Sequence, residues 1–474
     1  MLKRYGIWLV LLFAALVRIM FYSGHIFSDD SYYVKVAFDF LNGGDISYLG
    51  YPVMQNRIAQ IFSTYLSFRL FGSNEITSMI FPFFCSLGSI FIVYKFALKL
   101  YEENKNVALL SAFLMAILPT DIIFATISFA DLQASFFFYL SLYLLYSSVE
   151  KESYSFAILA GLFAVTALFF KSIIMTGFVL LIVIAGYGLI SRKFRIRNIV
   201  IYFLMIGFGL LLESWFNSIF FSDALRRLHI MEHNYAFSWY DFYPQSLGEG
   251  SEPGLSAYFL FLAKNLKYIF LRRFYLFLPL LALLPAIFNL ISGKWKLISI
   301  WYIGLILLFL FFSTSLNSYR PMSLEQSWYL FPIFIPVVLI VGEYLSRFSW
   351  KFSRVILVFL LFFSLYMSYE YRGYFDVESK AEFKEYISGI DGKQIFTDHH
   401  TKYGVDLIRG YRDYQNVKLL DKLTTHAKQG DIVIISKKKL DELKLQGFDY
   451  EFDNFNNSPE KYKFGEFEVF ELTN

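Results

Sequence analysis

The sequence predicts a polytopic α-helical membrane protein with a small α/β domain near its C-terminal end. Of its 474 residues, 57% are hydrophobic and only 17% are charged, and the mean hydropathy is +0.48. A water-soluble fold needs more polar surface than this composition supplies. Apolar runs recur until about residue 370, each near the length that crosses about 30 Å of hydrocarbon.

The first apolar run, residues 7–22, follows Lys3 and Arg4. It could be a cleaved signal peptide, but no small-x-small cleavage pattern follows it, so we interpret the run as a retained helix. Further spans are predicted at 76–98, 107–128, 132–148, 155–170, 172–190, 199–221, 274–291, 297–313, 327–345 and 355–369. The expected fold therefore has about eleven transmembrane helices.

The basic residues predict the orientation of these spans. With Lys3 and Arg4 in the cytoplasm, every strongly basic short loop falls on that same side, as the positive-inside rule requires. These loops carry Lys99 and Lys105, then Lys151, then the segments 191–197, 293–296 and 346–354. We therefore expect a cytoplasmic N-terminus and a protein of the plasma (inner) membrane.

Two long external segments are predicted to place helices in the membrane interface. Residues 23–75 and 222–273 are too long for simple hairpin loops, and they contain amphipathic stretches at 56–72 and 255–273.

The residues from about 373 to 474 form the second predicted domain, after a transmembrane domain of residues 1–372. Segments 393–398 and 430–438 look like strands, and 417–430 looks helical. Since an odd number of spans precedes it, this α/β domain is expected outside the cytoplasm.

Motifs for several kinds of chemistry are absent from the sequence. It contains no P-loop, no Rossmann glycine fingerprint, no HExxH motif and no Cys-His metal spacing. Its single cysteine, Cys85, rules out an internal disulfide. Nucleotide-driven transport and zinc hydrolysis are therefore unsupported, and we expect no required cofactor or metal and no nucleic-acid partner.

The predicted topology gathers carboxylates and cations on the external face. They are Asp29, Asp30, Arg57, Asp131, Lys171, Arg226, His233, Arg272, Arg273 and Arg320. This combination suits transfer of a sugar from a lipid phosphate. Cations can hold the leaving phosphate, and a carboxylate can take the proton of an acceptor hydroxyl.

The order of motifs resembles the protein O-mannosyltransferase-like branch of the GT-C glycosyltransferases, which includes the protein mannosyltransferases and the lipid A aminoarabinose transferase. The resemblance covers residues 1–345 and is strongest in the first 175. It is carried by "SDDSYYVKVAFDFLNGG" (28–44), "YP…R…LFG" (51–72), "LMAILPTDIIFATISFADLQASFFFYLSLYLL" (114–145), "ALFFKS" (167–172) and "YLFPIFIPVVLIVG" (329–342).

This resemblance implies transfer of a sugar from a polyprenyl-phosphate carrier to an external acceptor, usually with inversion and without a nucleotide. Asp29 falls on the usual catalytic Asp, and Asp30 replaces the usual Glu. Asp131 matches the acid that opens the fourth span, and Arg57 falls close to a basic phosphate ligand. The acceptor is expected to be a protein, glycan or lipid.

On this interpretation Asp29 is the general base, and Asp30 and Asp131 orient the acceptor or the sugar. The donor is predicted to be held by Arg57, Lys171, Arg272, Arg273, Arg320 and His233.

Plainer interpretations stay open at this stage. One alternative is that Asp29 and Asp30 cap a helix over 31–41 and that Asp131 caps the fourth span. In the same way, Lys171 has the alternative of snorkelling at a membrane boundary, Arg272 and Arg273 that of interfacial anchors, and His233 that of a structural residue. The competing functions are a flippase or transporter of lipid-linked glycans and a scaffold without catalysis.

Overall fold

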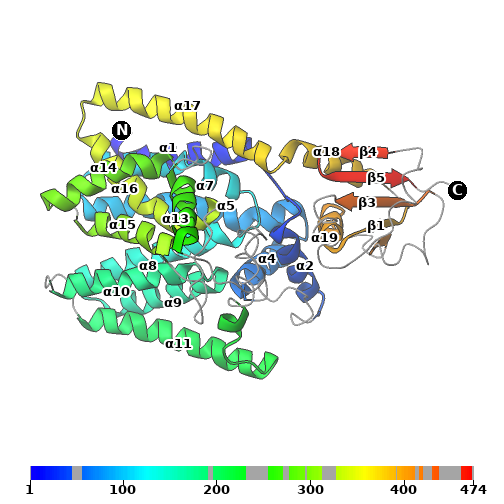
Figure 1. The fold of residues 1–474 in the computed structure, drawn as a ribbon, viewed down its shortest axis with the longest axis horizontal. Coiled ribbons are helices and arrows are strands. Elements are labelled where there is room, and N and C mark those ends of the chain that lie inside the picture. The colour runs from blue at the N-terminus through cyan, green and yellow to red at the C-terminus, as the bar shows by residue number, and fades with distance from the viewer. Residues whose placement is uncertain are drawn as a thin grey trace.

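The computed structural model is a bundle of membrane-type helices joined at one end to an α/β domain (Figure 1). It describes residues 2–44, 56–190, 196–230, 255–270, 277–293, 296–311, 327–390, 392–411, 416–419, 430–436 and 461–471. Between bundle and domain lie two shorter helices, α2 (Asp29–Leu41) and α4 (Ile58–Phe71).

The bundle helices follow the predicted apolar runs. They are α1 (Leu2–Met20), α5 (Glu75–Leu100), α6 (Lys105–Ala116), α8 (Ala130–Glu150), α9 (Tyr154–Phe170), α10 (Ile174–Ile190), α11 (Ile196–Phe221), α14 (Phe277–Ser292), α15 (Lys296–Phe311), α16 (Phe334–Ser346) and α17 (Trp350–Tyr374). Among the described residues, five segments are long and apolar enough to span a membrane: Glu75–Leu100, Ala130–Glu150, Ile196–Phe221, Tyr329–Ser346 and Trp350–Tyr374. The protein is thus an integral membrane protein, while the expected total of about eleven spans stays a prediction.

The continuous helix expected over 107–128 is interrupted, which corrects that detail of the sequence analysis. Helix α6 ends at Ala116, and a short helix, α7 (Pro119–Phe124), follows. Leu118 is extended, with φ −69° and ψ 117°, because the residue before a proline is disfavoured in the helical region.

Arg18 stabilises this interruption. Its Nη1 donates to the freed carbonyl oxygen of Ala116 at 3.1 Å, and its Nη2 forms an ion pair with Asp121 in α7. Both side chains are buried, so this ion pair connects α1 to the break between α6 and α7.

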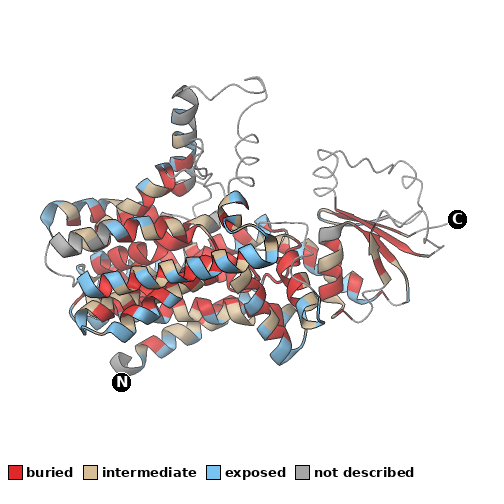
Figure 2. Cartoon of the chain, turned by 90° about the horizontal axis from the view of Figure 1, so that it is seen from below, coloured by how far each residue is buried: buried red, intermediate tan, exposed pale blue. Residues whose placement is uncertain are grey.

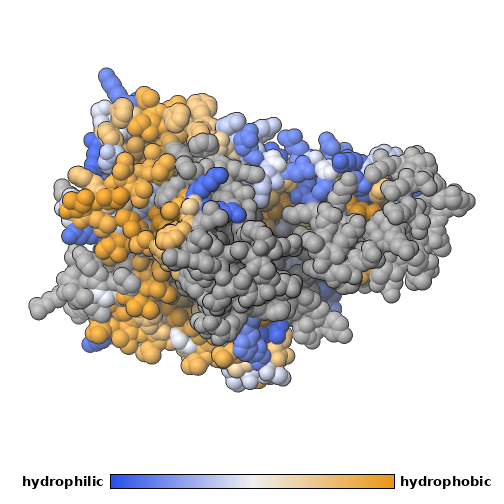
Figure 3. Space-filling model, viewed as in Figure 1, coloured by the Kyte–Doolittle hydropathy of each residue, from blue (hydrophilic) through white to orange (hydrophobic). Residues whose placement is uncertain are grey.

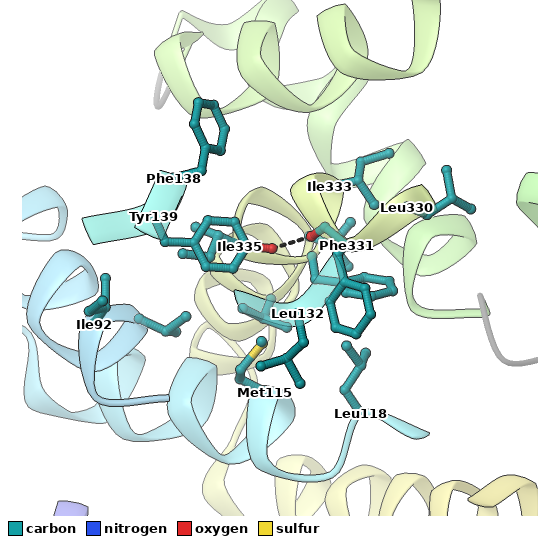
Figure 4. Close-up of a cluster of buried hydrophobic side chains, with 14 of the residues drawn as sticks. Ile92, Met115, Leu118, Leu132, Phe138, Tyr139, Leu330, Phe331, Ile333 and Ile335 are labelled. Atoms are coloured by element: carbon teal, nitrogen blue, oxygen red, sulfur yellow. Dashed lines mark hydrogen bonds between the residues drawn. The ribbon is translucent and has the colours of Figure 1, made fainter. Parts of the chain in front are cut away.

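The bundle core lies between α6, α8 and the segment made of a 3-10 helix, η4 (Ser327–Ile333), and α16. Figure 4 shows Met115, Leu132, Phe331 and Ile335 converging there, and the hydroxyl of Tyr139 donates to the carbonyl oxygen of Phe331. In Figure 2 the buried residues, in red, gather toward the inside of the helix bundle. This core holds the starts of α8 and α16 in fixed relation.

Small residues let α9 and α11 approach closely. A Cβ on Gly161 would lie 3.0 Å from the carbonyl oxygen of Tyr202, and a Cβ on Gly209 would overlap Val165. Close backbone approach at small residues is a common way to pack helices in membranes.

The outside of the bundle is apolar, as Figure 3 shows in orange on the side away from the α/β domain. Polar groups collect at the two ends of the bundle instead. Helix α8 runs between those ends: Lys151 follows its last turn, whereas Asp131 lies in its first turn. The basic loop after α8 and the predicted site are therefore at opposite ends of the bundle.

The α/β domain begins with α18 (Val377–Ser388) and contains α19 (His399–Ile408) and a five-stranded sheet of order β2-β1-β3-β5-β4. The strands are β1 (Ile395–Thr397), β2 (Val417–Leu419), β3 (Ile432–Ser436), β4 (Lys461–Phe464) and β5 (Phe467–Glu471). Strands β2, β1 and β3 are parallel, and β5 and β4 continue antiparallel.

The prediction of a helix over 417–430 is wrong for its first three residues, because residues 417–419 form strand β2. Ile395 of β1 pairs with Val417, and Val417 is buried in the domain core. Burial against a neighbouring strand therefore outweighs the helical pattern of the segment.

The α/β domain packs directly on α2. Figure 1 shows α19 beside α2, and Leu407 of α19 is buried with Val34 and Ala37 of α2. Next to them the rings of Phe38 and Tyr411 are stacked with centroids 3.5 Å apart. The helix that begins with Asp29 and Asp30 therefore lies between the bundle and the domain.

Candidate functional site

Asp29 and Arg57 form an ion pair at the end of the bundle that faces the α/β domain. Asp29 occupies the first turn of α2, and Arg57 immediately precedes α4. Arg57 Nη1 donates to Asp29 Oδ2 at 3.2 Å, and the Asp29 side chain remains 40% exposed. Asp29 is thus a carboxylate that a second molecule can reach.

Tyr33 lies one turn beyond Asp29 and supports the same arginine. Its hydroxyl accepts a hydrogen bond from Arg57 Nη1. Burial alone would lower the pKa of Arg57, but Tyr33, Asp29 and Asp131 raise it above its ordinary value. Arg57 therefore stays a cation at the edge of the site.

Asp30 has different surroundings, although it is the next residue. Its side chain is fully buried. Its Oδ2 accepts the backbone N–H of Ile26 at 2.6 Å, and its Oδ1 accepts those of Ser28 at 2.7 Å and Ser31 at 3.0 Å.

His25 adds a fourth partner, with Nδ1 lying 3.0 Å from Asp30 Oδ2. Burial opposes the charge of Asp30, but His25 and the backbone N–H groups lower its pKa. Asp30 therefore holds the turn that precedes α2, whose N-cap residue is Ser28, whereas Asp29 has an arginine as its partner.

Asp131 and Lys171 form a second ion pair, which is buried. Lys171 ends α9 and Asp131 opens α8, and their Nζ and Oδ1 atoms are 2.5 Å apart. Lys171 Nζ also lies 4.7 Å from the ring centroid of Tyr329. A buried, paired lysine differs from the snorkelling anchor that the sequence left open.

The two ion pairs belong to one charged cluster. Arg57 interacts electrostatically with Asp131 as well as with Asp29. In α4, Gln60 Nε2 donates to Ser128 Oγ at 3.1 Å, just before α8. This contact connects the helix that follows Arg57 to the turn that precedes Asp131.

Arg227 and Glu213 are buried residues that the sequence analysis did not single out. Arg227 Nε lies 2.9 Å from both carboxylate oxygens of Glu213. Its Nη1 donates to Ser172 Oγ at 2.7 Å, and its Nη2 donates to the carbonyl oxygen of Asn56 at 3.3 Å.

Ser172 follows Lys171 in the chain, and Asn56 precedes Arg57. Arg227 therefore holds the chain beside both cations. The adjacent Arg226, which the sequence pattern predicts at the external face, is only partly buried. The available signal was Glu213, an acid inside an apolar span, which requires a partner.

Four predicted donor ligands lie outside the described residues, namely His233, Arg272, Arg273 and Arg320. Within the described part of the chain, no three acidic, His or Cys side chains are grouped as metal ligands. Asp30 faces the backbone turn before α2, so it does not join Asp29 and Asp131.

Comparison with known proteins identifies the fold of the chain. Residues 60–216 match the family described as dolichyl-phosphate-mannose-protein mannosyltransferase. ArnT from Cupriavidus metallidurans bound to undecaprenyl phosphate superposes with a TM-score of 0.57 at 15% identity, over 98% of both chains. The chain has the GT-C membrane glycosyltransferase fold. The family match and the shared fold agree with the resemblance to the protein O-mannosyltransferase-like GT-C glycosyltransferases that the sequence shows.

Two further structures share the GT-C fold. Apo ArnT from the same organism has a TM-score of 0.59 and 13% identity, over 99% of this chain and 98% of that one. The oligosaccharyltransferase AglB from Archaeoglobus fulgidus, in complex with an inhibitory peptide and a dolichol-phosphate, has a TM-score of 0.51 and 10% identity, over 92% and 70%. No curated protein sequence matches this chain.

The Arg227–Glu213 pair yields a stability prediction. Replacing Arg227 with Met leaves the Glu213 carboxylate buried without its partner, so unfolding should become easier by about 3–5 kcal/mol. The adjacent, partly exposed Arg226 is the control. Its guanidinium lies 3.9 Å from the ring centroid of Phe221, so Arg226→Met should change stability by about 1 kcal/mol or less. Thermal unfolding in detergent measures both variants, and equal shifts for the two would contradict the assignment.

Proposed function

We propose that this GT-C protein transfers a sugar from a polyprenyl-phosphate-linked donor to an acceptor hydroxyl or phosphate outside the cytoplasm. The observation that carries the proposal is the charged cluster around Arg57. It combines an accessible carboxylate, Asp29, with two cations, Arg57 and Lys171, at one end of the bundle. The proposed donor agrees with the ArnT structure that holds undecaprenyl phosphate and with the AglB structure that holds dolichol-phosphate.

In the proposed reaction Asp29 accepts the proton of the acceptor hydroxyl while that oxygen attacks the anomeric carbon. The bond from the anomeric carbon to the phosphate oxygen breaks, and polyprenyl phosphate leaves from the opposite face, which inverts the anomeric centre. Arg57 and Lys171 stabilise the negative charge that collects on the phosphate.

The ion pair between Asp29 and Arg57 has a role in this sequence of events. A donor phosphate competes with Asp29 for the guanidinium of Arg57, because both are anions. Donor binding therefore releases the Asp29 carboxylate to act as a base. Asp131 holds Lys171 in place through their ion pair, and we assign it the orientation of the sugar.

The external location of the site is also part of the proposal. The loop after α8, which carries Lys151, lies at the bundle end opposite Asp131. If the basic loops are cytoplasmic, the site and the α/β domain face outward. The acceptor would then be an extracytoplasmic protein, glycan or lipid.

The donor class is tested by supplying purified protein with alternative sugar donors. We expect transfer from a polyprenyl-phosphate sugar, no transfer from a nucleotide sugar, and activity that survives EDTA. The physical reason is that Arg57 and Lys171 supply the positive charge that a metal would otherwise bring to the phosphate. Direct use of a nucleotide sugar would count against the proposal, and complete loss of activity to EDTA would refute its metal-free form.

The roles of the two adjacent acids can be separated by substitution with Asn. Asp29→Asn should lower kcat by about 10²–10⁴-fold and leave thermal stability close to that of the parent protein. Donor binding should be kept or become tighter, because the variant lacks the carboxylate charge that competes with the donor phosphate for Arg57. Asp30→Asn should lower kcat by a smaller factor than Asp29→Asn does. It should also lower thermal stability, because it removes the charge from a side chain that accepts three backbone N–H groups.

The matched control is Asp39→Asn in the same helix, which removes only a partly exposed ion pair with Lys35. It should leave turnover close to the parent rate. An Asp29→Asn protein that still turns over near the parent rate would contradict the assignment of Asp29 as the base.

A further inference from the structure

The loop between α1 and α2 inserts an aromatic side chain into the α/β domain. Phe27, two residues before Asp29, belongs to the hydrophobic core of that domain. Its ring meets those of Phe383 in α18 and Phe467 in β5 edge-on, with centroid separations of 5.4 and 5.0 Å. A residue beside the proposed base is therefore buried in a domain that begins some 350 positions later in the chain.

The backbone of Phe27 is held in an unusual conformation. Its φ is +55°, which is a genuine outlier for a bulky side chain. The N–H groups on either side of it, those of Ile26 and Ser28, both donate to the carboxylate of Asp30. A displacement of Phe27 is thus passed to Asp30, the residue that adjoins Asp29.

Gly404 in α19 makes room for this loop. A Cβ at position 404 would overlap the ring of Phe27 and would lie 3.0 Å from Nε2 of His25. Glycine in a helix interior is less stable than alanine, so the helix gives up intrinsic stability at the point where the loop approaches. The close approach is the structural reason for a glycine here.

Glu75, at the start of α5, holds the same loop from the membrane side. Its Oε1 accepts the backbone N–H of His25 at 2.6 Å and also pairs with Lys384 of α18. The loop is therefore bonded to the bundle and to the α/β domain at once. Movement of that domain relative to the bundle would shift residues 25–28.

We propose that Phe27 and Gly404 are positioning residues, through which the α/β domain sets the place of the Asp29 carboxylate. Docking of that domain is then part of assembling the catalytic site. The inference rests on the proposed function, because it assigns Asp29 the role of base. It concerns the orientation of that base and not the binding of the donor.

A double-mutant cycle tests the contact. Gly404→Ala should displace Phe27 and lower kcat by roughly tenfold or more, since catalysis is sensitive to misplacement of about 1 Å. The KM for the lipid donor should change by about twofold or less, because Arg57 and Lys171 are untouched. Phe27→Leu should also lower kcat, but the combined variant should lose less than the product of the two single losses, because Leu leaves room for the added methyl group.

The matched control is Gly389→Ala in the same domain. Gly389 has φ −85°, and a Cβ there would meet atoms only at 3.6 Å or beyond. This variant should keep the parent kcat. Hydrogen exchange of residues 24–31 gives a readout that does not depend on activity, and it should accelerate in Gly404→Ala and recover in the double variant.

The outcomes separate this inference from the proposed function. If the parent protein does not transfer sugar from the lipid donor but the exchange pattern is as expected, the proposed function fails and the contact stands. The inference is overturned if Gly404→Ala keeps the kcat and the hydrogen exchange of the parent protein. It is also overturned if Gly404→Ala and Gly389→Ala lose kcat equally. A double variant whose kcat loss equals the product of the two single losses would overturn it as well. If Gly404→Ala does not fold, Phe27→Leu decides alone, and a parent-like kcat in that variant overturns the inference.

Discussion

A charge buried among membrane helices is costly unless it is paired, and this constraint organises the bundle end that carries the site. The Asp131–Lys171 pair joins α8 to the end of α9. The Glu213–Arg227 pair belongs to α11 and the segment after it, and Arg227 also donates to the carbonyl oxygen of Leu168 in α9. The Arg18–Asp121 pair joins α1 to the break before α7. Of these four pairs, Asp29–Arg57 is the one that is substantially open to solvent on one side. It is the pair that an incoming anion can most readily separate.

The same constraint gives two neighbouring carboxylates different environments. Asp30 is enclosed by backbone N–H groups and by His25, so its charge is used to hold a turn. Asp29 points to an arginine and to solvent. The tightly bonded acid fixes the backbone from which the accessible acid projects, as expected of a catalytic group supported by a rigid second layer of contacts.

Local patterns in the sequence were sufficient for the membrane class and for most helix positions. The choice of Asp29 and Arg57 as candidate site residues depended on the resemblance to a known family, because a local pattern also fits Asp29 as a helix cap. Pro119 carried a signal for the break in 107–128, but the surrounding apolar run concealed it. The strand at Val417 depends on pairing with Ile395, and no local pattern reports such a partner. The same holds for Phe27 and Gly404, which meet across most of the chain length, and for Arg227, whose partners lie on three separate segments.

In the proposed site, Arg57 and Lys171 hold the phosphate of a lipid-linked donor beside Asp29. Electron microscopy of the protein with undecaprenyl phosphate added would locate that phosphate. We expect phosphate density in contact with both Arg57 and Lys171, with the Asp29 carboxylate turned away from Arg57 and facing the space beside the phosphate. Phosphate density at a position that touches neither cation would contradict the proposed site.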